Sequence, residues 1–369
     1  MSKQREPLVH ITKRSVLPWY KSWMIRAAAI AAALVVCGVI TTIMTGLNPI
    51  DIYRTMIEAS FSTARRSWTV FQNTAILLCV SLAVIPAFKM RFWNLGAEGQ
   101  MLAGGLATTA CMICLRDALP SGVLIPMMII ASLLAGALWG FIPAFFKAKW
   151  GTNETLFTLM MNYVAIQLVS FFIILWEVPK GAGQIGIINQ NTQIGGLPVI
   201  GGQKYLLNIV ITVVLTIAMY IYMTYSKQGY EIAVVGESQN TARYAGIRVD
   251  RVIIRTMILS GALCGLTGML LVGGTDHTLT VSITGGRGFT AVMVAWLAKF
   301  NPVWMILASF LLVFLDKGAG EISTQFGLNK SFSDILTGVI LFFIIGCEFF
   351  INYRINFRHS SRKEETAHV

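Results

Sequence analysis

Long apolar blocks recur along this chain, and they limit what it can fold into. Hydrophobic residues make up 55% of the sequence and charged residues 12%. A helix needs about 20 apolar residues to cross about 30 Å of hydrocarbon. Nine blocks poor in charge approach or reach this length, at residues 24–47, 70–88, 102–115, 123–146, 155–176, 206–224, 252–273, 303–315 and 335–351. The sequence therefore predicts an all-α, polytopic integral membrane protein.

Lysine and arginine gather on alternating loops, which indicates a topology. They precede the first block, follow every second block and close the chain, at Lys3, Arg5, Lys13, Arg14, Lys21, Lys89, Arg91, Lys147, Lys149, Lys227, Arg243, Arg248, Arg251, Arg354, Arg358, Arg362 and Lys363. Because loops rich in these residues stay in the cytoplasm, both termini are expected there. The net charge of +12 is then a topology signal with a secondary role toward membrane lipids, and we expect no nucleic-acid partner.

Two cytoplasmic ends require an even number of crossings, so a tenth segment is expected beside the nine blocks. The candidate is 288–300, "GFTAVMVAWLAKF", whose 13 residues span only about 20 Å as a helix. We expect a half-length or re-entrant helix that turns at Asn301-Pro302 and continues through 303–315. The prediction is about ten transmembrane or half-membrane helices in one domain, 24–352, with a cytoplasmic loop at 226–252 and basic cytoplasmic ends at 1–23 and 353–369.

Two further features of the apolar spans are closely spaced small residues and Gly-rich polar interruptions. Small residues four apart, at Gly136/Gly140 and Gly261/Gly265, predict close helix packing. An apolar span, a Gly-rich polar break and a small-residue helix follow one another at 70–115 and again at 252–315. Paired interrupted helices are typical of transporters, which use them to place backbone polar groups along a substrate pathway.

The cytoplasmic loop is the most informative segment outside the blocks. Ser238 is predicted to cap a short helix at 239–244 that Gly246 terminates. A solvated linker would need no apolar residues, yet this loop carries Tyr230, Val234, Val235, Tyr244 and Ile247. Its composition therefore favours a docking surface over a linker.

Three motifs in order resemble the permease subunits of bacterial nucleoside ABC importers, a group similar to the ribose and branched-chain amino acid permeases. They are "FWNLGAEGQMLAGGLAT" at 92–108, "GTNETLFTLMMNYVA" at 151–165 and "GYEIAVVGESQNTARYAGI" at 229–247. The resemblance extends over about 23–353, with mild departures at Leu95 and at Ser238-Gln239. It implies that 24–352 is a permease domain of the bacterial inner membrane, working by alternating access.

The resemblance also implies partners. A second permease subunit, identical or not, would pair with this one, cytoplasmic ATPase subunits would dock on the coupling loop, and an extracytoplasmic protein would deliver the substrate. The coupling role falls on Gly229, Tyr230, Glu231, Gly236, Glu237, Arg243, Tyr244 and Gly246. Because the chain has no Gly-Lys dipeptide, it has no nucleotide-binding P-loop, and ATP is expected to be hydrolysed by a partner. We expect no enzyme activity and no cofactor in this chain.

Polar and aromatic residues within the spans are candidates for meeting a nucleoside. Amides supply hydrogen bonds and aromatic faces receive the base, which selects Asn73, Trp93, Phe157, Asn162, Tyr163, Gln167 and Phe289. Asn162 is four residues from Thr158 and shares its helix face. The alternative is that such amides only bond neighbouring helices together.

The stretch "NLGAEGQ" at 94–100 is interpreted as the start of a helix near an inner gate. Asn94 is predicted to cap the helix and Glu98 to lie in its first turn, beside the positive end of the helix dipole. The motif comprises Asn94, Gly96, Glu98, Gly99 and Gln100.

Other chemistry has weaker support. Cys111-x-x-Cys114 is expected to be two buried small residues, the four histidines are too scattered to indicate a metal site, and no nucleophile–base set is apparent. Asp276 and His277 are expected to be solvated polar residues of an outer loop; a proton relay formed by them would instead favour a carrier driven by an ion gradient. The predicted function is a permease for nucleosides, with a simple sugar such as ribose or, more distantly, a secondary carrier as alternatives.

Overall fold

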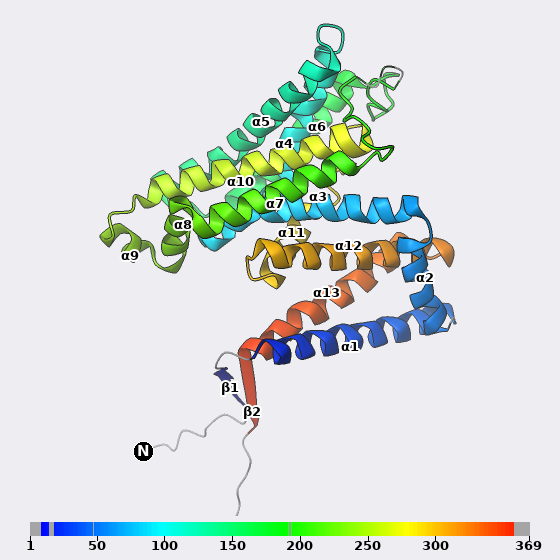
Figure 1. The fold of residues 1–369 in the computed structure, drawn as a ribbon, viewed down its shortest axis with the longest axis vertical. Coiled ribbons are helices and arrows are strands. Elements are labelled where there is room, and N and C mark those ends of the chain that lie inside the picture. The colour runs from blue at the N-terminus through cyan, green and yellow to red at the C-terminus, as the bar shows by residue number, and fades with distance from the viewer. Residues whose placement is uncertain (1–8, 15–17, 47, 191, 193, 358–369) are drawn as a thin grey trace, which may run out of the picture. The chain divides into compact units, whose positions relative to one another are not determined.

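The computed structural model describes residues 9–14, 18–46, 48–190, 192 and 194–357, and nearly all of its regular structure is helical (Figure 1). Of the basic residues expected at the cytoplasmic ends, Lys3, Arg5, Arg358, Arg362 and Lys363 lie outside the described residues. One short sheet was not predicted: strand β1 (Val9–Lys13) pairs antiparallel with β2 (Tyr353–Phe357). This pairing places the two terminal segments side by side.

The described residues form two compact units. One contains the chain up to Ala59 and from Leu315 onward, and the other is Ser60–Phe314. The single membrane domain predicted over 24–352 stays a prediction.

The first unit is built on helices α1 (Trp19–Thr45) and α13 (Lys330–Asn352), which pack against each other. The guanidinium of Arg26 donates to Glu348 at 2.6 Å, and both side chains are partly buried. The unit also holds most of α2 (Pro49–Phe61) and the second part of α12 (Pro302–Gln325).

The second unit holds the remaining helices. They are α3 (Ala64–Lys89), α4 (Ala97–Cys114), α5 (Ser121–Trp150), α6 (Glu154–Trp176), α7 (Leu206–Tyr225), α8 (Lys227–Glu237), α9 (Gln239–Tyr244), α10 (Val249–Leu271) and α11 (Arg287–Leu297). A π-helical turn, η1 (Val272–Asp276), extends α10. Helix α10 packs against α3, α4 and α5, and α3 and α10 are the most buried long helices of this unit.

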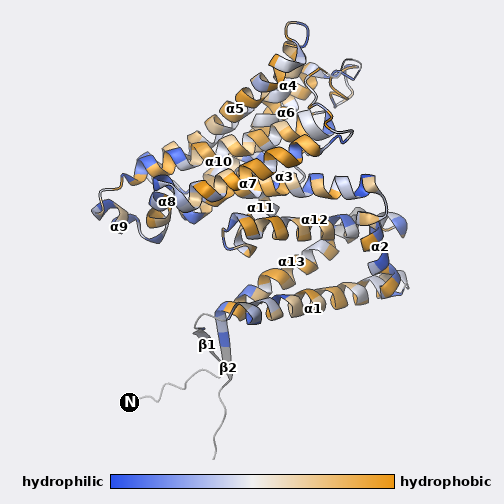
Figure 2. Ribbon diagram, in the orientation of Figure 1, coloured by the Kyte–Doolittle hydropathy of each residue, from blue (hydrophilic) through white to orange (hydrophobic). Residues whose placement is uncertain are grey.

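Eight helices within the described part of the chain are long and apolar enough to cross a membrane, and α11 is a shorter apolar helix. This confirms the predicted fold class. Figure 2 shows apolar residues along these spans and hydrophilic ones on α8 and α9. Several predicted bounds were too short; for example, α3 starts six residues before 70, α4 starts five residues before 102, and α12 continues ten residues beyond 315. The predicted blocks stopped at polar residues such as Gln100 and Asp316, whereas the helices continue through them.

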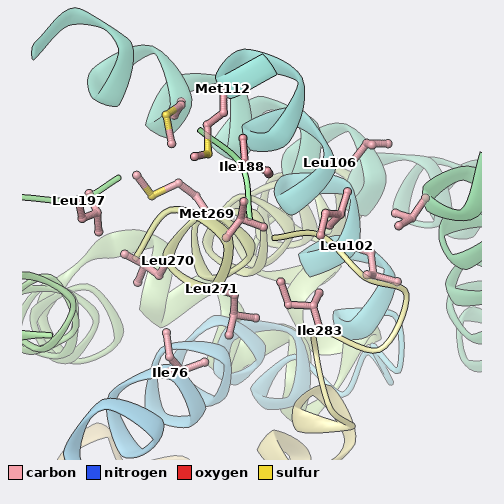
Figure 3. Packing of buried hydrophobic residues seen from close by; sticks show 14 of the residues in the cluster. Ile76, Leu102, Leu106, Met112, Ile188, Leu197, Met269, Leu270, Leu271 and Ile283 are labelled. Carbon is pink, nitrogen blue, oxygen red and sulfur yellow. The ribbon is translucent and has the colours of Figure 1, made fainter. Parts of the chain in front are cut away.

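Small residues let α10 approach its neighbours closely, as their spacing predicted. A Cβ added to Gly136 would lie 2.2 Å from the carbonyl oxygen of Gly261, and one added to Gly104 would lie 2.2 Å from that of Gly265. No side chain fits at either position. The apolar core of this unit includes Met269, Leu270 and Leu271 of α10, Leu102 and Leu106 of α4, and Ile76 and Ile283 (Figure 3).

Candidate functional site

Helices α8 and α9 form a hairpin in the predicted cytoplasmic loop, and serine side chains start both helices. Ser226 Oγ accepts from the backbone N–H of Gly229 at 2.9 Å, and Ser238 Oγ accepts from Thr241 at 3.3 Å. Gly246, at φ +77°, follows the end of α9 in the left-handed conformation. The predicted 239–244 helix is therefore confirmed, whereas α8 was not predicted. Its signals were the Ser226 cap and the apolar pair Ile232 and Val235, three residues apart and both buried.

Three contacts fasten α8 to the membrane helices. Gly229 lies against backbone carbonyls at the end of α7, where an added Cβ would be 2.5 Å from Tyr222 O. At the other end, a Cβ on Gly236 would be 2.0 Å from the carbonyl oxygen of Lys89, the last residue of α3. Glu231 accepts from Arg255 of α10 at 2.6 Å. The predicted coupling residues Gly229, Glu231 and Gly236 thus hold the hairpin in place.

The other predicted coupling residues face outward. Tyr244 is 93% exposed and Tyr230 is 67% exposed. Glu237, Arg243 and Gly246 are exposed as well. The hairpin therefore presents an aromatic and charged surface on a firmly seated base.

The connection between α3 and α4, residues 90–96, was predicted to contain a helix cap at Asn94, and this detail is wrong. Gly96 occupies the N-cap position of α4, and Asn94 Oδ1 accepts instead from the N–H of Gly96 at 3.1 Å. Asn94 and Gln100 exchange amide hydrogen bonds of 3.2 and 3.3 Å, and Asn94 also donates to Ser260 of α10 at 3.2 Å. The asparagine therefore ties the connection to α4 and α10.

Helix α6 holds the same connection from another side. Asn162 accepts from the N–H of Gly99 at 2.9 Å and donates to the carbonyl of Leu95 at 2.8 Å, while Thr158 accepts from the N–H of Leu95 at 3.2 Å. Both side chains are buried on one face of α6, as the four-residue spacing predicted. In this structure the amide of Asn162 joins helices, which is the alternative raised for it from the sequence.

Glu98 lies in the first turn of α4, as predicted, and it has a partner that the sequence did not indicate. Its carboxylate accepts from the backbone N–H of Gly288 at 2.6 Å, at the start of α11. The side chain is only 8% exposed. The two interrupted spans predicted at 70–115 and 252–315 therefore meet at this carboxylate.

Arg287 is a functional candidate that the sequence analysis missed. The guanidinium Nη2 donates to Asn73 Oδ1 of α3 at 3.1 Å, and Nη1 donates to the carbonyl of Ile283 at 3.2 Å. Residues 277–286 form an irregular segment that leads into α11; Leu279 and Ile283 belong to the buried core, whereas Val281 and Gly286 are exposed. An arginine between two glycines before an apolar helix was the available signal, and such a charge within a membrane protein is a functional candidate.

The remaining pathway candidates divide between two regions. Trp93 stacks on Trp296 of α11, with ring centroids 5.7 Å apart, and Phe289 follows Arg287 by two residues; both Trp93 and Phe289 are about two-fifths exposed. On α6, Phe157 packs against Phe146 of α5, whereas Tyr163 and Gln167 are exposed. Asn73, Trp93 and Phe289 thus lie on or beside α11, and the carbonyl of Trp93 also accepts from Thr158 of α6 at 3.4 Å.

A polar cluster lies at η1. Gln72 Nε2 donates to Thr275 Oγ1 at 2.6 Å, and Asn208 packs against Gly274, where an added Cβ would be 2.4 Å from Asn208 Oδ1. Gln72 and Asn208 are both almost fully buried. A π turn is frequently found at functional sites, and here it lies between α10 and the irregular segment.

Comparisons with known proteins identify the family of this chain. Residues 67–345 match the family described as branched-chain amino acid transport system / permease component. The chain is 28% identical over 365 residues to the glucose ABC transporter permease protein TsgB13 of Haloferax volcanii, covering 96% of this chain and 95% of the relative. It is 30% identical to the guanosine ABC transporter permease protein NupP of Bacillus subtilis, covering 81% and 84%, and 28% identical to the nucleoside ABC transporter permease protein NupB of Lactococcus lactis, covering 83% and 86%.

The family match spans about three quarters of the sequence and includes most of α3 and all of α4 to α11, with the hairpin and the broken span described above. The chain therefore belongs to the branched-chain amino acid transport system / permease component family, and it is a multi-pass ABC transporter permease component.

Proposed function

We propose that this chain is the membrane subunit of an importer that takes up nucleosides across the bacterial inner membrane. Two relatives named for nucleoside or guanosine transport, at 28% and 30% identity, support the cargo class. Transport proceeds by alternating access. The chain pairs with a second permease subunit, receives cargo from an extracytoplasmic binding protein, and binds no cofactor of its own.

The observation that carries the proposal is the seating of the α8–α9 hairpin. Its outward face offers Tyr230, Arg243 and Tyr244 to a cytoplasmic ATPase, while Gly236 rests on the backbone of Lys89. A backbone-to-backbone contact has no flexible side chain to absorb movement, because packed protein interiors deform little. Closure of the ATPase subunits on the hairpin therefore pushes directly on the inner end of α3.

The cargo path runs along the α3–α11 side of the second unit. Asn73 and Arg287 supply hydrogen-bonding groups there, and the partly exposed rings of Trp93 and Phe289 supply faces on which a base can stack. The α6 candidates have weaker support. They are Phe157, Asn162, Tyr163 and Gln167, and the amide of Asn162 already bonds α4.

The test is uptake into vesicles that contain the complete transporter. The permease, its ATPase and its partner permease are reconstituted together, with ATP enclosed and the cognate binding protein outside. Radiolabelled guanosine and adenosine should accumulate with enclosed ATP and fail to accumulate with ADP. Uptake that proceeds without ATP, driven by a proton or sodium gradient alone, would refute the ATP-driven mechanism.

Glucose is the second candidate cargo, because the glucose permease relative covers almost the whole chain at 28% identity. In the same vesicles, excess unlabelled glucose or ribose should leave guanosine uptake unchanged. If labelled glucose or ribose accumulates and the nucleosides do not, the cargo assignment is wrong while the ATP-driven mechanism stands.

A further inference from the structure

The connection between α3 and α4, residues 90–96, joins the hairpin side to α11 through the contacts given above, beside the direct packing of α11 against α3. It begins at Lys89, whose carbonyl oxygen lies under Gly236 of α8. It ends next to Glu98, whose carboxylate binds the first turn of α11. Trp93, near its middle, stacks on Trp296 near the last turn of α11.

Trp93 and Glu98, five residues apart in the sequence, therefore contact the two ends of α11. The helix has 11 residues and is about 16 Å long. Its opening backbone N–H groups have no partner within the helix, and in a membrane such groups need one from elsewhere in the protein. Glu98 supplies that partner at Gly288, and its negative charge also suits the positive end of the helix. At the other end the two indoles lie 32° from parallel with centroids 5.7 Å apart.

The connection itself is held on several sides, which makes it suitable for transmitting displacement. Asn94 is bonded to Gln100 and to Ser260 of α10, and Leu95 is bonded to Thr158 and Asn162 of α6. Fully satisfied buried polar networks of this kind rigidify the segment that they hold. A push on Lys89 therefore moves the connection as a unit and does not simply bend it.

Helix α11 packs against α3, but the chain on either side of it is not helical. The irregular segment 277–286 precedes it, and the left-handed residues Lys299 and Phe300, at φ +50° and +58°, follow it. Both flanks are loop backbone, and short flanking loops are where a helix can change its orientation. The contacts of Trp93 and Glu98 then act together with the packing against α3 to set where α11 lies.

We propose that Glu98 and Trp93 are positioning residues that make α11 follow α8, so that the movement of the docked ATPase reaches the cargo path. This inference rests on the proposed function, because it assumes ATP-driven transport. It assigns Glu98 no contact with cargo. Its role is to carry α11, and with it Arg287 and Phe289, between the two access states.

The experiment measures cargo imported per ATP hydrolysed in the reconstituted transporter. Glu98→Ala removes the acceptor for the Gly288 N–H, and we expect at least about a tenfold fall in cargo per ATP, since hydrogen bonds to charged groups are among the stronger ones. Glu98→Gln keeps an acceptor oxygen of similar reach and should lose much less. Trp93→Ala should also lower the ratio, whereas Trp93→Phe, which keeps an aromatic ring, should recover most of it.

Matched controls separate positioning from folding. Asp117→Asn alters an exposed carboxylate, and Phe171→Ala removes an exposed ring of α6; both should leave the ratio unchanged. A purely structural role for Glu98 or Trp93 reduces the amount of assembled complex, so uptake and ATP hydrolysis fall together and the ratio stays constant. That result for both residues would overturn the inference.

Cargo preference gives a second readout. If Glu98 only positions α11, Glu98→Gln keeps the wild-type ratio of guanosine to adenosine uptake. A changed preference would mean that Glu98 contacts cargo and would contradict the positioning role. If Glu98→Ala fails to assemble, the Trp93 pair decides the question. Failure of the proposed function differs from failure of this inference, because in the first case the wild-type complex itself would show no ATP-driven nucleoside uptake.

Discussion

Replacing Gly236 with alanine is the sharpest test of the hairpin's seating. The added Cβ would lie 2.0 Å from the carbonyl oxygen of Lys89 and 3.3 Å from the Cα of Met90. A carbon and an oxygen need about 3 Å or more between them, so α8 has to retreat by about 1 Å. Gly229 and Glu231 hold the rest of α8 against α7 and α10, so the helix cannot retreat freely.

Overpacking of this kind costs about 1–3 kcal/mol, which corresponds to roughly a 5- to 160-fold change in the population of the seated arrangement. We therefore expect Gly236→Ala to lower ATP-driven uptake by at least about fivefold. Cargo-dependent stimulation of the ATPase should fall with it, because the hairpin would no longer transmit the signal in either direction.

The assay uses the reconstituted vesicles, with uptake and ATP hydrolysis both divided by the amount of assembled complex. Gly122→Ala is the matched control, because Gly122 lies in the first turn of α5 and its added Cβ would meet nothing within 4 Å. If Gly236→Ala supports normal uptake and normal ATPase stimulation, the coupling assignment of the hairpin is wrong.

Three further predictions concern other contacts. Gly265→Ala places a Cβ 2.2 Å from a carbonyl oxygen of α5, so the melting temperature in detergent should fall, by an amount equivalent to about 1–3 kcal/mol; an unchanged value would contradict the close packing. Arg255→Glu should cost about 1 kcal/mol of stability, because the pair is partly exposed, and the exchanged pair Glu231→Arg with Arg255→Glu should restore part of it; no rescue would show that the ion pair contributes little. Two glycine N–H groups hold the pKa of Glu177 below its usual range, so protection of the 177–205 loop from proteolysis should persist at neutral pH and be lost as the pH falls below about 4 and through the lowered pKa. Glu177→Gln should remove that pH dependence, and a dependence that survives would have another source.

Much of the fold followed from local patterns. The apolar blocks predicted the long helices, the four-residue glycine spacing predicted the close approach of α5 and α10, and Ser238 with Gly246 predicted both ends of α9. These features depend on neighbours within a turn or two of the chain, so residue type and spacing are sufficient to reveal them.

The features that were predicted wrongly or missed depend on residues far away in the sequence. Asn94 has the side chain of a helix cap, yet it bonds Gln100 and Ser260, and the latter is 166 positions away. Helix α8 was missed because much of its apolar character is buried against α3, α7 and α10, which a single stretch of sequence does not disclose. Arg287 was missed because its partner, Asn73 of α3, is distant in the sequence.

The sequence by itself determined the class of the molecule and the approximate positions of its spans, because hydrocarbon admits only long apolar helices with satisfied backbones. The orientation that the basic loops indicate stays a prediction. The tertiary structure alone decided how the two interrupted spans are completed. Glu98 and Gly288 are 190 positions apart, and the residues around either one do not indicate that the two will form a hydrogen bond. Unpaired backbone groups at a break inside a membrane protein have to find partners on other helices, and only the packing of α3, α4, α6, α10 and α11 shows which partners they find.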